Sequence, residues 1–268
     1  MTRRTGGRGA RGGSTNRLRF LDTQVRNVAY SRFGAEWYTV DGVSGKVASW
    51  TERSLHPSGI LSIDASHKME QATSAQQCAI PTADSLFNGR VSAAFADQRY
   101  TSHASASAWR CLHDGTGCAV YNVLSYSNLT GAKYVLATTS GGTAVGFNTG
   151  TSGAALAAAV LNVGAVIGAP SGGTLTTSTA YYTRYRYEEN VSPEIDIFAK
   201  TTSMNTIPST SGAPSTGDPT ATLMLGNRQA VNAPFVGNWL ETIVIKGSYS
   251  ATIDALIKSY FAAKYGVI

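Results

Sequence analysis

Residues 221–268 read ATLMLGNRQAVNAPFVGNWLETIVIKGSYSATIDALIKSYFAAKYGVI, and this stretch decides the fold class. Residues 223–226 form a short apolar run that ends in glycine. Residues 235–245 are rich in β-branched and aromatic side chains, which favour extended backbone. Both segments are therefore predicted to be β-strands.

The segment after these strands has a different period. From residue 250 to residue 264, apolar side chains recur at spacings of three and four, which places them on one face of a helix. Ser250 has the side chain of an N-cap, and Gly266 suits a left-handed C-cap. The chain is expected to end in one short helix.

Eight residues of this stretch resemble the closing motif of the concanavalin A-like, or laminin-G-like (LamG), jelly rolls. In that family a strand of the form F-x-G-x-x-x-E-x-x-V/I precedes a helix that ends Y-x-x-x-K-Y/W-G. The matching residues are Phe235, Gly237, Glu241, Val244, Tyr260, Lys264, Tyr265 and Gly266. The resemblance implies an all-β, antiparallel concanavalin A-like β-sandwich with a short C-terminal helix.

Two earlier segments carry weaker matches to the same family. Val47, Trp50, Glu52 and Ser54 loosely fit the family pattern V-x-x-W-x-D/E-x-S. In the same region, residues 35–40 and 46–50 flank Asp41-Gly42, a dipeptide typical of hairpin turns. Residues 88–95 resemble the N-G-x-P-x-x-x-F entry to a strand, with Ser92 at the proline position. Residues 201–220 hold three of the eight prolines and are predicted to be a loop.

The composition favours one large β domain. The chain has 268 residues, and only 14% of them are charged. Sandwiches of this size commonly form one domain. The predicted organisation is a basic arm over residues 1–32 and a sandwich over residues 33–268.

The positive charge is concentrated at the N-terminus. Residues 1–32 hold eight arginines and one acid, a net charge of +7, whereas the whole chain carries +6. A segment rich in arginine and glycine cannot bury apolar surface, so the arm is expected to be flexible or ordered by a partner. The predicted anchoring residues are Arg3, Arg4, Arg8 and Arg11, and their partner is a protein lattice or nucleic acid.

No cofactor, metal site or membrane span is predicted. The four histidines lack metal-ligand spacing, and the scattered aspartates leave calcium undecided. Cys78, Cys111 and Cys118 form no C-x-x-C pair. A bridge between Cys111 and Cys118 and three free buried thiols are both compatible with the sequence, and the free thiols are favoured.

Residues 194–198, Glu-Ile-Asp-Ile-Phe, resemble the E-[ILV]-D-[IVF]-x-E strand of laminarinase-type glycoside hydrolases. Glu194 and Asp196 match its first two carboxylates, but Phe198 and Ala199 stand where the acid/base residue is needed. The favoured interpretation is a solvent-facing acidic pair on an ordinary strand. No catalytic residue is predicted.

Residues 181–187, YYTRYRY, alternate on a strand between a tyrosine face and an arginine face. An exposed row would contact a glycan or a protein partner. The candidate contacts are Tyr181, Tyr185, Tyr187, Arg184 and Arg186. The alternative, which is favoured, places the tyrosines in the sandwich core and the arginines in water.

Together these features resemble virion proteins of bacteriophages, such as head-decoration, head-fibre or tail adsorption proteins. The resemblance implies a non-enzymatic structural protein that is present in many copies or as a homo-oligomer. Its partners would be capsid or tail proteins and a host surface glycan. No secretory signal is visible, so assembly in the host cytoplasm and a place in the virion are expected. The alternatives are a glycan-cleaving hydrolase and a free carbohydrate-binding lectin.

Overall fold

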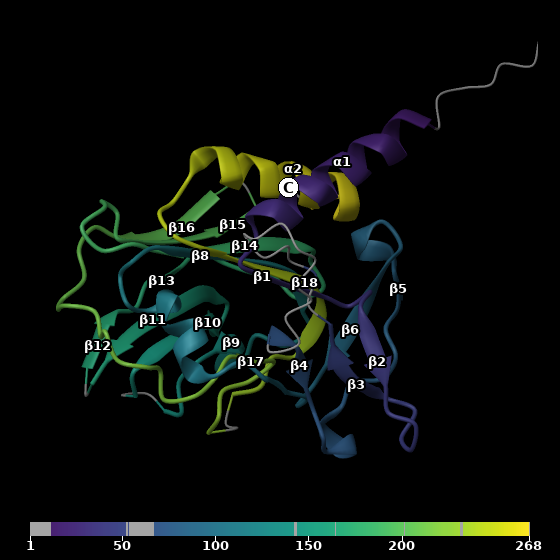
Figure 1. Ribbon diagram of the computed structural model, residues 1–268, viewed down its shortest axis with the longest axis horizontal. Helices are drawn as coiled ribbons and strands as arrows, with labels where there is room; N and C mark the ends of the chain where they lie inside the picture. The colour runs from purple at the N-terminus through teal and green to yellow at the C-terminus, as the bar shows by residue number, and fades with distance from the viewer. Residues whose placement is uncertain are drawn as a thin grey trace, which may run out of the picture.

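The structure is a computed structural model that describes residues 12–51, 53, 67–141, 144–163, 165–200, 202–230 and 233–267. Two antiparallel sheets lie face to face, and two helices lie side by side over the outer surface of one sheet (Figure 1). The predicted all-β sandwich with a short C-terminal helix is confirmed. Among the described residues, no helix is both long and apolar enough to cross a bilayer.

Sheet A has eight strands and contains the longest ones. In spatial order they are β16 (Thr202–Ile207), β15 (Ile195–Ala199), β14 (Tyr181–Tyr187), β8 (Cys118–Tyr126), β18 (Gly237–Lys246), β6 (Arg90–Phe95) and β5 (Thr82–Asp84), with β1 (Ser31–Gly34) paired to β18. The helices over this sheet are α1 (Gly12–Val28) and α2 (Ala251–Tyr265).

Sheet B has ten strands. In spatial order they are β12 (Ala165–Gly168), β11 (Ala155–Asn162), β10 (Gly146–Ser152), β9 (Ala132–Ala137), β17 (Met224–Leu225), β7 (Tyr100–Ser102), β4 (Met69–Glu70), β3 (Val47–Trp50) and β2 (Tyr38–Val40), with β13 (Ser171–Gly172) paired to β11. Short 3-10 helices, η2 (Ser74–Gln76), η3 (Ser85–Phe87) and η4 (Ala106–Leu112), lie between the strands.

The main core lies between the two sheets and is dominated by aromatic rings. Trp50 of β3 lies edge-to-face against Trp239 of β18 and Tyr100 of β7, with ring centroids 5.2 and 5.3 Å apart. All three rings are fully buried. Edge-to-face pairs at these distances add to the gain from burial. Strands β3 and β7 belong to sheet B and β18 to sheet A, so this cluster joins the two sheets.

A second core lies between sheet A and the helices. Leu21 and Val25 of α1 meet Ile257 and Phe261 of α2 over Ile243 of β18. The apolar face predicted for the last segment is therefore the face that covers the sheet. The Ser250 hydroxyl accepts a hydrogen bond from the Ile253 amide at 3.3 Å. The other end of α2 stops at Gly266, whose φ is 70°, so both predicted caps are confirmed.

The closing motif has a physical basis in a buried polar network below the helices. Glu241 of β18 is fully buried, and its Oε1 lies 2.5 Å from Arg32 Nε. Its Oε2 lies 3.1 Å from Lys264 Nζ and accepts hydrogen bonds from the hydroxyls of Tyr260 and Tyr265. Three of the four partners come from the motif residues of α2. Three residues of the motif in this chain thus contact one buried carboxylate.

A bulge in β18 aims this carboxylate at the helices. The register against β8 shifts between Trp239 and Glu241. The extra residue in a bulge disturbs the in-out alternation of a strand. Consequently Leu240 contributes to the core beneath the helices, as Ile243 does, and the Glu241 carboxylate bonds to side chains of α2 on that same face.

The N-terminal region differs from the predicted arm. Residues 12–28 form α1, and residues 31–34 form β1, which pairs with β18. Val25 is fully buried, and Arg32 is held by Glu241. Over residues 12–32 the chain is therefore ordered by its own sandwich, because one apolar stripe of the helix finds a partner in α2. Residues 1–11 lie outside the described residues.

The predicted hairpin around Asp41-Gly42 is confirmed by the antiparallel pairing of β2 and β3. The loop predicted over residues 201–220 is wrong in its first part. Strand β16 (Thr202–Ile207) pairs with β15 and forms an edge of sheet A. Its side chains are exposed or half-buried, so it has no apolar pattern that would have revealed it in the sequence.

Candidate functional site

The predicted anchoring residues lie outside the part of the chain that the structure describes. These residues are Arg3, Arg4, Arg8 and Arg11. Their proposed contact with protein or nucleic acid stays a prediction.

The tyrosine and arginine strand is not an exposed binding row. Tyr181, Tyr185 and Tyr187 of β14 are buried in the main core, as the favoured interpretation predicted. The arginines, however, are not in water. Arg184 forms ion pairs with Asp196 and with Asp254 of α2, and it is 6% exposed.

Arg186 is equally withdrawn, at 7% exposure, and it donates a hydrogen bond to the Pro193 carbonyl at 2.5 Å. The face of β14 opposite the core lies beneath α2, which the local alternation cannot reveal. These five side chains therefore hold the fold together and offer no surface to a glycan.

The acidic pair on β15 is buried rather than solvent-facing. The Glu194 carboxylate accepts hydrogen bonds from the backbone amides of Thr210, at 2.6 Å, and Asn190, at 3.1 Å. Burial alone would raise its pKa, but the Thr210 and Asn190 bonds outweigh burial, and the pKa lies below its usual value. Asp196 is bound to Arg184 and Ser203. Both carboxylates are thus engaged in structural contacts.

His113 and the three cysteines are also buried. His113 is fully buried next to the Gly217 carbonyl, at 3.1 Å, and burial lowers its pKa. The three cysteines are free and buried, and burial raises the pKa of Cys78 and Cys111 to about 12. No group of three or more metal-ligating side chains occurs within the described ranges.

A further candidate surface is the outer face of sheet B, where Glu70 and Thr101 are half-buried and Ser49 and Met224 are buried. Strand registers place Ser49, Glu70, Thr101 and Met224 opposite one another on β3, β4, β7 and β17. Their chain neighbours Trp50, Met69, Tyr100 and Leu225 point into the main core. Because side chains alternate along a strand, this transverse row faces outward.

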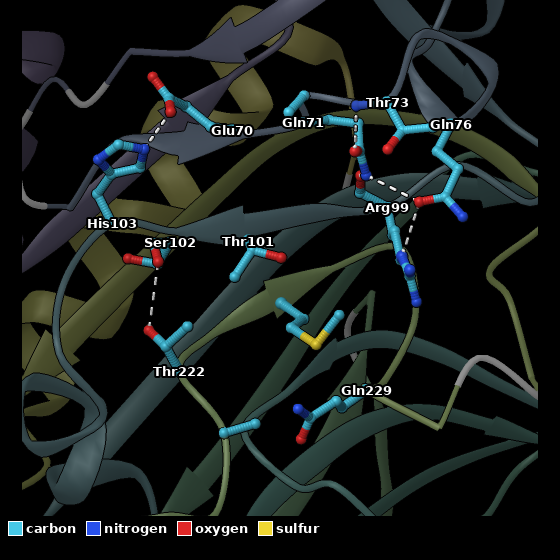
Figure 2. A pocket seen from close by; sticks show the side chains of 13 residues that line it. Glu70, Gln71, Thr73, Gln76, Arg99, Thr101, Ser102, His103, Thr222 and Gln229 are labelled. Carbon is cyan, nitrogen blue, oxygen red and sulfur yellow. Dashed lines mark hydrogen bonds and ion pairs between the residues drawn. The ribbon is translucent and has the colours of Figure 1, made fainter.

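A cleft of about 520 Å³ opens over this row (Figure 2). The segments that lead into and out of β4, β7 and β17 form its walls. Its lining side chains are Glu70, Gln71, Ala72, Thr73, Gln76, Arg99, Thr101, Ser102, His103, Ala221, Thr222, Met224 and Gln229. A volume of this size is in the range of small-ligand sites.

One wall of the cleft is a network of amides around Arg99. Gln71 Nε2 donates to the Arg99 carbonyl at 2.7 Å and to Gln76 Oε1 at 3.1 Å. Gln76 Oε1 also accepts from Arg99 Nε at 2.9 Å, as Figure 2 shows. Gln71 Oε1 accepts from the Thr73 amide at 2.8 Å. These bonds fix the side chains before any ligand arrives, which lowers the entropy cost of binding.

The opposite wall carries Glu70, the charged residue of the row, and its partner His103. Glu70 bonds to His103 Nε2 and to Lys68 Nζ. The Glu70 side chain is 34% exposed and His103 is 50% exposed. The His103 amide donates to the Lys68 carbonyl at 2.9 Å, so the backbone ladder between β4 and β7 sets their positions. Figure 2 shows this pair on the side of the cleft away from Arg99.

A smaller hollow of about 340 Å³ continues from the cleft toward β2 and β3. The two share Glu70, Gln71 and Ala72. The hollow adds Asp41, whose carboxylate accepts from the Val43 amide at 2.8 Å. Hydrogen bonds from the backbone of Val43 and Ser44 lower the pKa of Asp41. Two carboxylates therefore line the hollow, and one of them is shared with the cleft.

None of these lining residues was predicted from the sequence to belong to a site, and Asp41 was noted only as part of a turn. They come from five separate segments, between residue 39 and residue 229. The one local signal is a segment with three glutamines within seven residues, at positions 71, 76 and 77, in a chain with few charged residues. Only strand pairing brings the segments together.

No protein-family model matches this chain, and no curated protein matches it. Solved structures of the same shape exist. An arabinofuranosidase complexed with arabinofuranosyl-α-1,2-xylobiose superposes with a TM-score of 0.54 at 13% identity, over 83% of this chain and 52% of that one. The present chain thus spans about half the length of that enzyme. At this identity the likeness establishes the fold alone.

Two smaller domains superpose less well. The CBM40 module of the Ruminococcus gnavus IT-sialidase has a TM-score of 0.44 at 16% identity, over 56% of this chain and 84% of that one. Domain 4 of AbnA, a GH43 arabinanase from Geobacillus stearothermophilus, has a TM-score of 0.47 at 13% identity, over 70% and 82%.

These comparisons correct one prediction. The protein was expected not to be an enzyme, because the strand at residues 194–198 lacks an acid/base residue. The fold is glycosidase-like, since an arabinofuranosidase shares it over 83% of the present chain. The earlier argument concerned only β15, where Phe198 and Ala199 stand in place of an acid/base residue. Strand β15 contributes no residue to the cleft on sheet B, so the composition of β15 does not bear on catalysis there.

Proposed function

We propose that the protein binds a carbohydrate in the cleft on the outer face of sheet B. The observation that carries this proposal is the network formed by Gln71, Gln76 and Arg99 in the wall of this cleft. The similarity to the fold of an arabinofuranosidase supports it.

The chemistry of the lining suits a sugar. Amides and guanidinium groups offer donors and acceptors to hydroxyl groups, and a fixed arrangement of them selects for orientation. Thr101, Ala221 and Met224 provide apolar surface between the two polar walls, against which the C–H face of a sugar ring packs. The described lining residues include no Phe, Tyr or Trp, so affinity depends mainly on the hydrogen bonds.

Binding to a panel of plant and bacterial oligosaccharides, measured by calorimetry or on a glycan array, tests this proposal. We expect Arg99→Gln to weaken binding at least tenfold, a loss of about 1.4 kcal/mol, without lowering the melting temperature. Gln24→Ala, on α1 at the opposite side of the sandwich, is the matched control. Equal affinity in both variants would contradict the site.

Glycoside cleavage is the second candidate function, and a specific observation favours it. Glu70 and Asp41 line one hollow, and glycosidases use two carboxyl groups, one as the acid and one as base or nucleophile. The lowered pKa of Asp41 keeps it ionised. The test is release of reducing sugar from arabinan, xylan and β-glucan. Activity that is lost in both Glu70→Gln and Asp41→Asn would establish cleavage, and no release from any substrate would remove it.

A place in a bacteriophage virion, where the cleft would contact a host glycan, is the setting that the sequence resemblance implies. It stays a prediction. Quantitative co-purification of the chain with purified particles is the test, and its absence from particles would contradict it.

A further inference from the structure

A second groove lies on the other side of the molecule, between α1 and the start of sheet B. Its volume is about 340 Å³, and it is lined by Leu18, Arg19, Asp22, Arg26, Glu36, Trp37, Arg90, Tyr260 and Lys264. The lining holds four cations and two carboxylates, a net charge of +2. The proposed carbohydrate cleft shares none of these residues. We refer to this site as the basic groove.

Both acids of the basic groove are already neutralised by the protein. Asp22 lies 2.8 Å from Arg26 and 2.8 Å from Arg32. Glu36 lies 3.0 Å from Lys264 and 3.7 Å from Arg90. Each carboxylate therefore faces two cations. The buried Glu241 also pairs with Arg32 and Lys264, and with these two residues included the cations still exceed the carboxylates by two.

Two arginines remain available to a ligand. Arg19 projects from α1 into solvent, and it takes part in none of the ion pairs found among the described residues. The Arg90 side chain is 38% exposed, and its contact with Glu36 is long. Its Nε donates to the Lys264 carbonyl at 3.3 Å, which fixes the guanidinium at the edge of the groove. A fixed guanidinium with free N–H groups matches a phosphate oxygen pair.

Trp37 adds an aromatic ring to this cationic lining. It is half-buried, and the cationic centres of Arg32, Lys264 and Arg53 lie 4.7, 4.9 and 5.8 Å from its ring centroid. A positively charged groove with an exposed part of an aromatic ring is the combination that proteins use for single-stranded nucleic acid. A duplex presents no unstacked base to such a ring.

We propose that the basic groove binds single-stranded nucleic acid through its phosphodiester backbone, with Arg19 and Arg90 as phosphate contacts and Trp37 as a base contact. The charge of the preceding chain is consistent with this ligand, because residues 1–11 carry four further arginines and no acid. Backbone contacts make such binding salt-dependent and insensitive to sequence.

Fluorescence anisotropy of the full chain with a labelled 20-nucleotide thymidine strand, at several salt concentrations, tests the proposal. We expect the Arg19→Gln/Arg90→Gln double variant to lose affinity about tenfold at low salt. Its slope of log affinity against log salt should fall by about 1.4, since each single-strand phosphate contact contributes about 0.7. Arg110→Gln, an exposed arginine on η4 outside the groove, is the matched control.

Folding of the double variant is checked by its melting temperature. Arg19→Gln alone, at an exposed helix position, gives a second test with an expected slope change of about 0.7. Absence of binding by the intact chain, equal binding by the double variant and the control, or tighter binding of the corresponding duplex would each overturn the proposal. Glycan binding by the other cleft would be unaffected by any of these results.

Discussion

The two outer faces of the sandwich use their charged groups in opposite ways. On sheet A, Glu241 lies beneath α1 and α2, is fully buried and is surrounded by two cations and two tyrosine hydroxyls. On sheet B, Glu70 is 34% exposed and sits at the wall of an open cleft. A buried and satisfied carboxylate has no capacity left for a ligand. An exposed one contributes little to stability and is available for binding.

Removal of the buried charge is the change with the largest expected effect. Glu241→Gln removes the fully buried counter-charge that Arg32 and Lys264 share, and leaves them only the partly exposed Asp22 and Glu36. Breaking such a buried cluster costs about 3–5 kcal/mol. Urea unfolding of wild type and variant measures this loss. A change below about 1 kcal/mol would mean that the network is not what holds the helices on sheet A.

Acid should act on the same network. Burial alone would raise the pKa of Glu241, but Arg32 and Lys264 lower it from 4.5 to about 2. A group with a depressed folded-state pKa stabilises above its unfolded pKa, and the contribution is lost as pH falls through the folded value. We expect roughly 3 kcal/mol of stability to disappear between pH 4.5 and pH 2. Glu241→Gln should show a shallower decline in urea unfolding over that range.

Removal of the N-cap of α2, on the same face of the sandwich, is expected to have an intermediate effect on stability. Ser250→Ala removes the acceptor for the Ile253 amide, and such a loss costs about 1 kcal/mol. Thermal unfolding followed by circular dichroism measures it. Thr252 lies in the first turn of α2 and is exposed. Thr252→Ala is the control and should leave the melting temperature nearly unchanged.

The smallest effect on stability is expected on sheet B. Glu70→Gln removes an exposed contact with Lys68 and His103, and the change should stay within about 0.5 kcal/mol. The same variant should weaken binding in the cleft. A loss comparable to that of Glu241→Gln would show that the two faces do not differ in the way described above.

Much of the fold was predictable from local patterns. The strand and helix periods, the caps of α2 and the hairpin at Asp41-Gly42 depend on neighbours within a few residues. The helix over residues 12–28 was missed, because its apolar stripe is narrow and sits in an arginine-rich segment. Its stability comes from contact with α2, which lies more than two hundred residues away in the chain.

The candidate sites were harder to predict because the surroundings of each side chain also come from segments far away in the chain. The YYTRYRY strand has the composition of a binding surface, yet α2 covers its arginines and the second sheet covers its tyrosines. Glu194 and Asp196 match a catalytic pattern, but their partners Thr210 and Arg184 turn them into structural groups. A local pattern specifies which side chains share a face and does not specify what lies on that face.

The sequence by itself determined the class of fold, the closing helix and the concentration of positive charge at the N-terminus, because period, caps and composition are local properties. Only the tertiary structure decided which carboxylates are buried and which are open. The motif of residues 235–266 is the clearest case. Its glutamate, lysine and tyrosines were recognisable as a pattern, but their role as one neutralised cluster follows from the bulge in β18 and the docking of two helices.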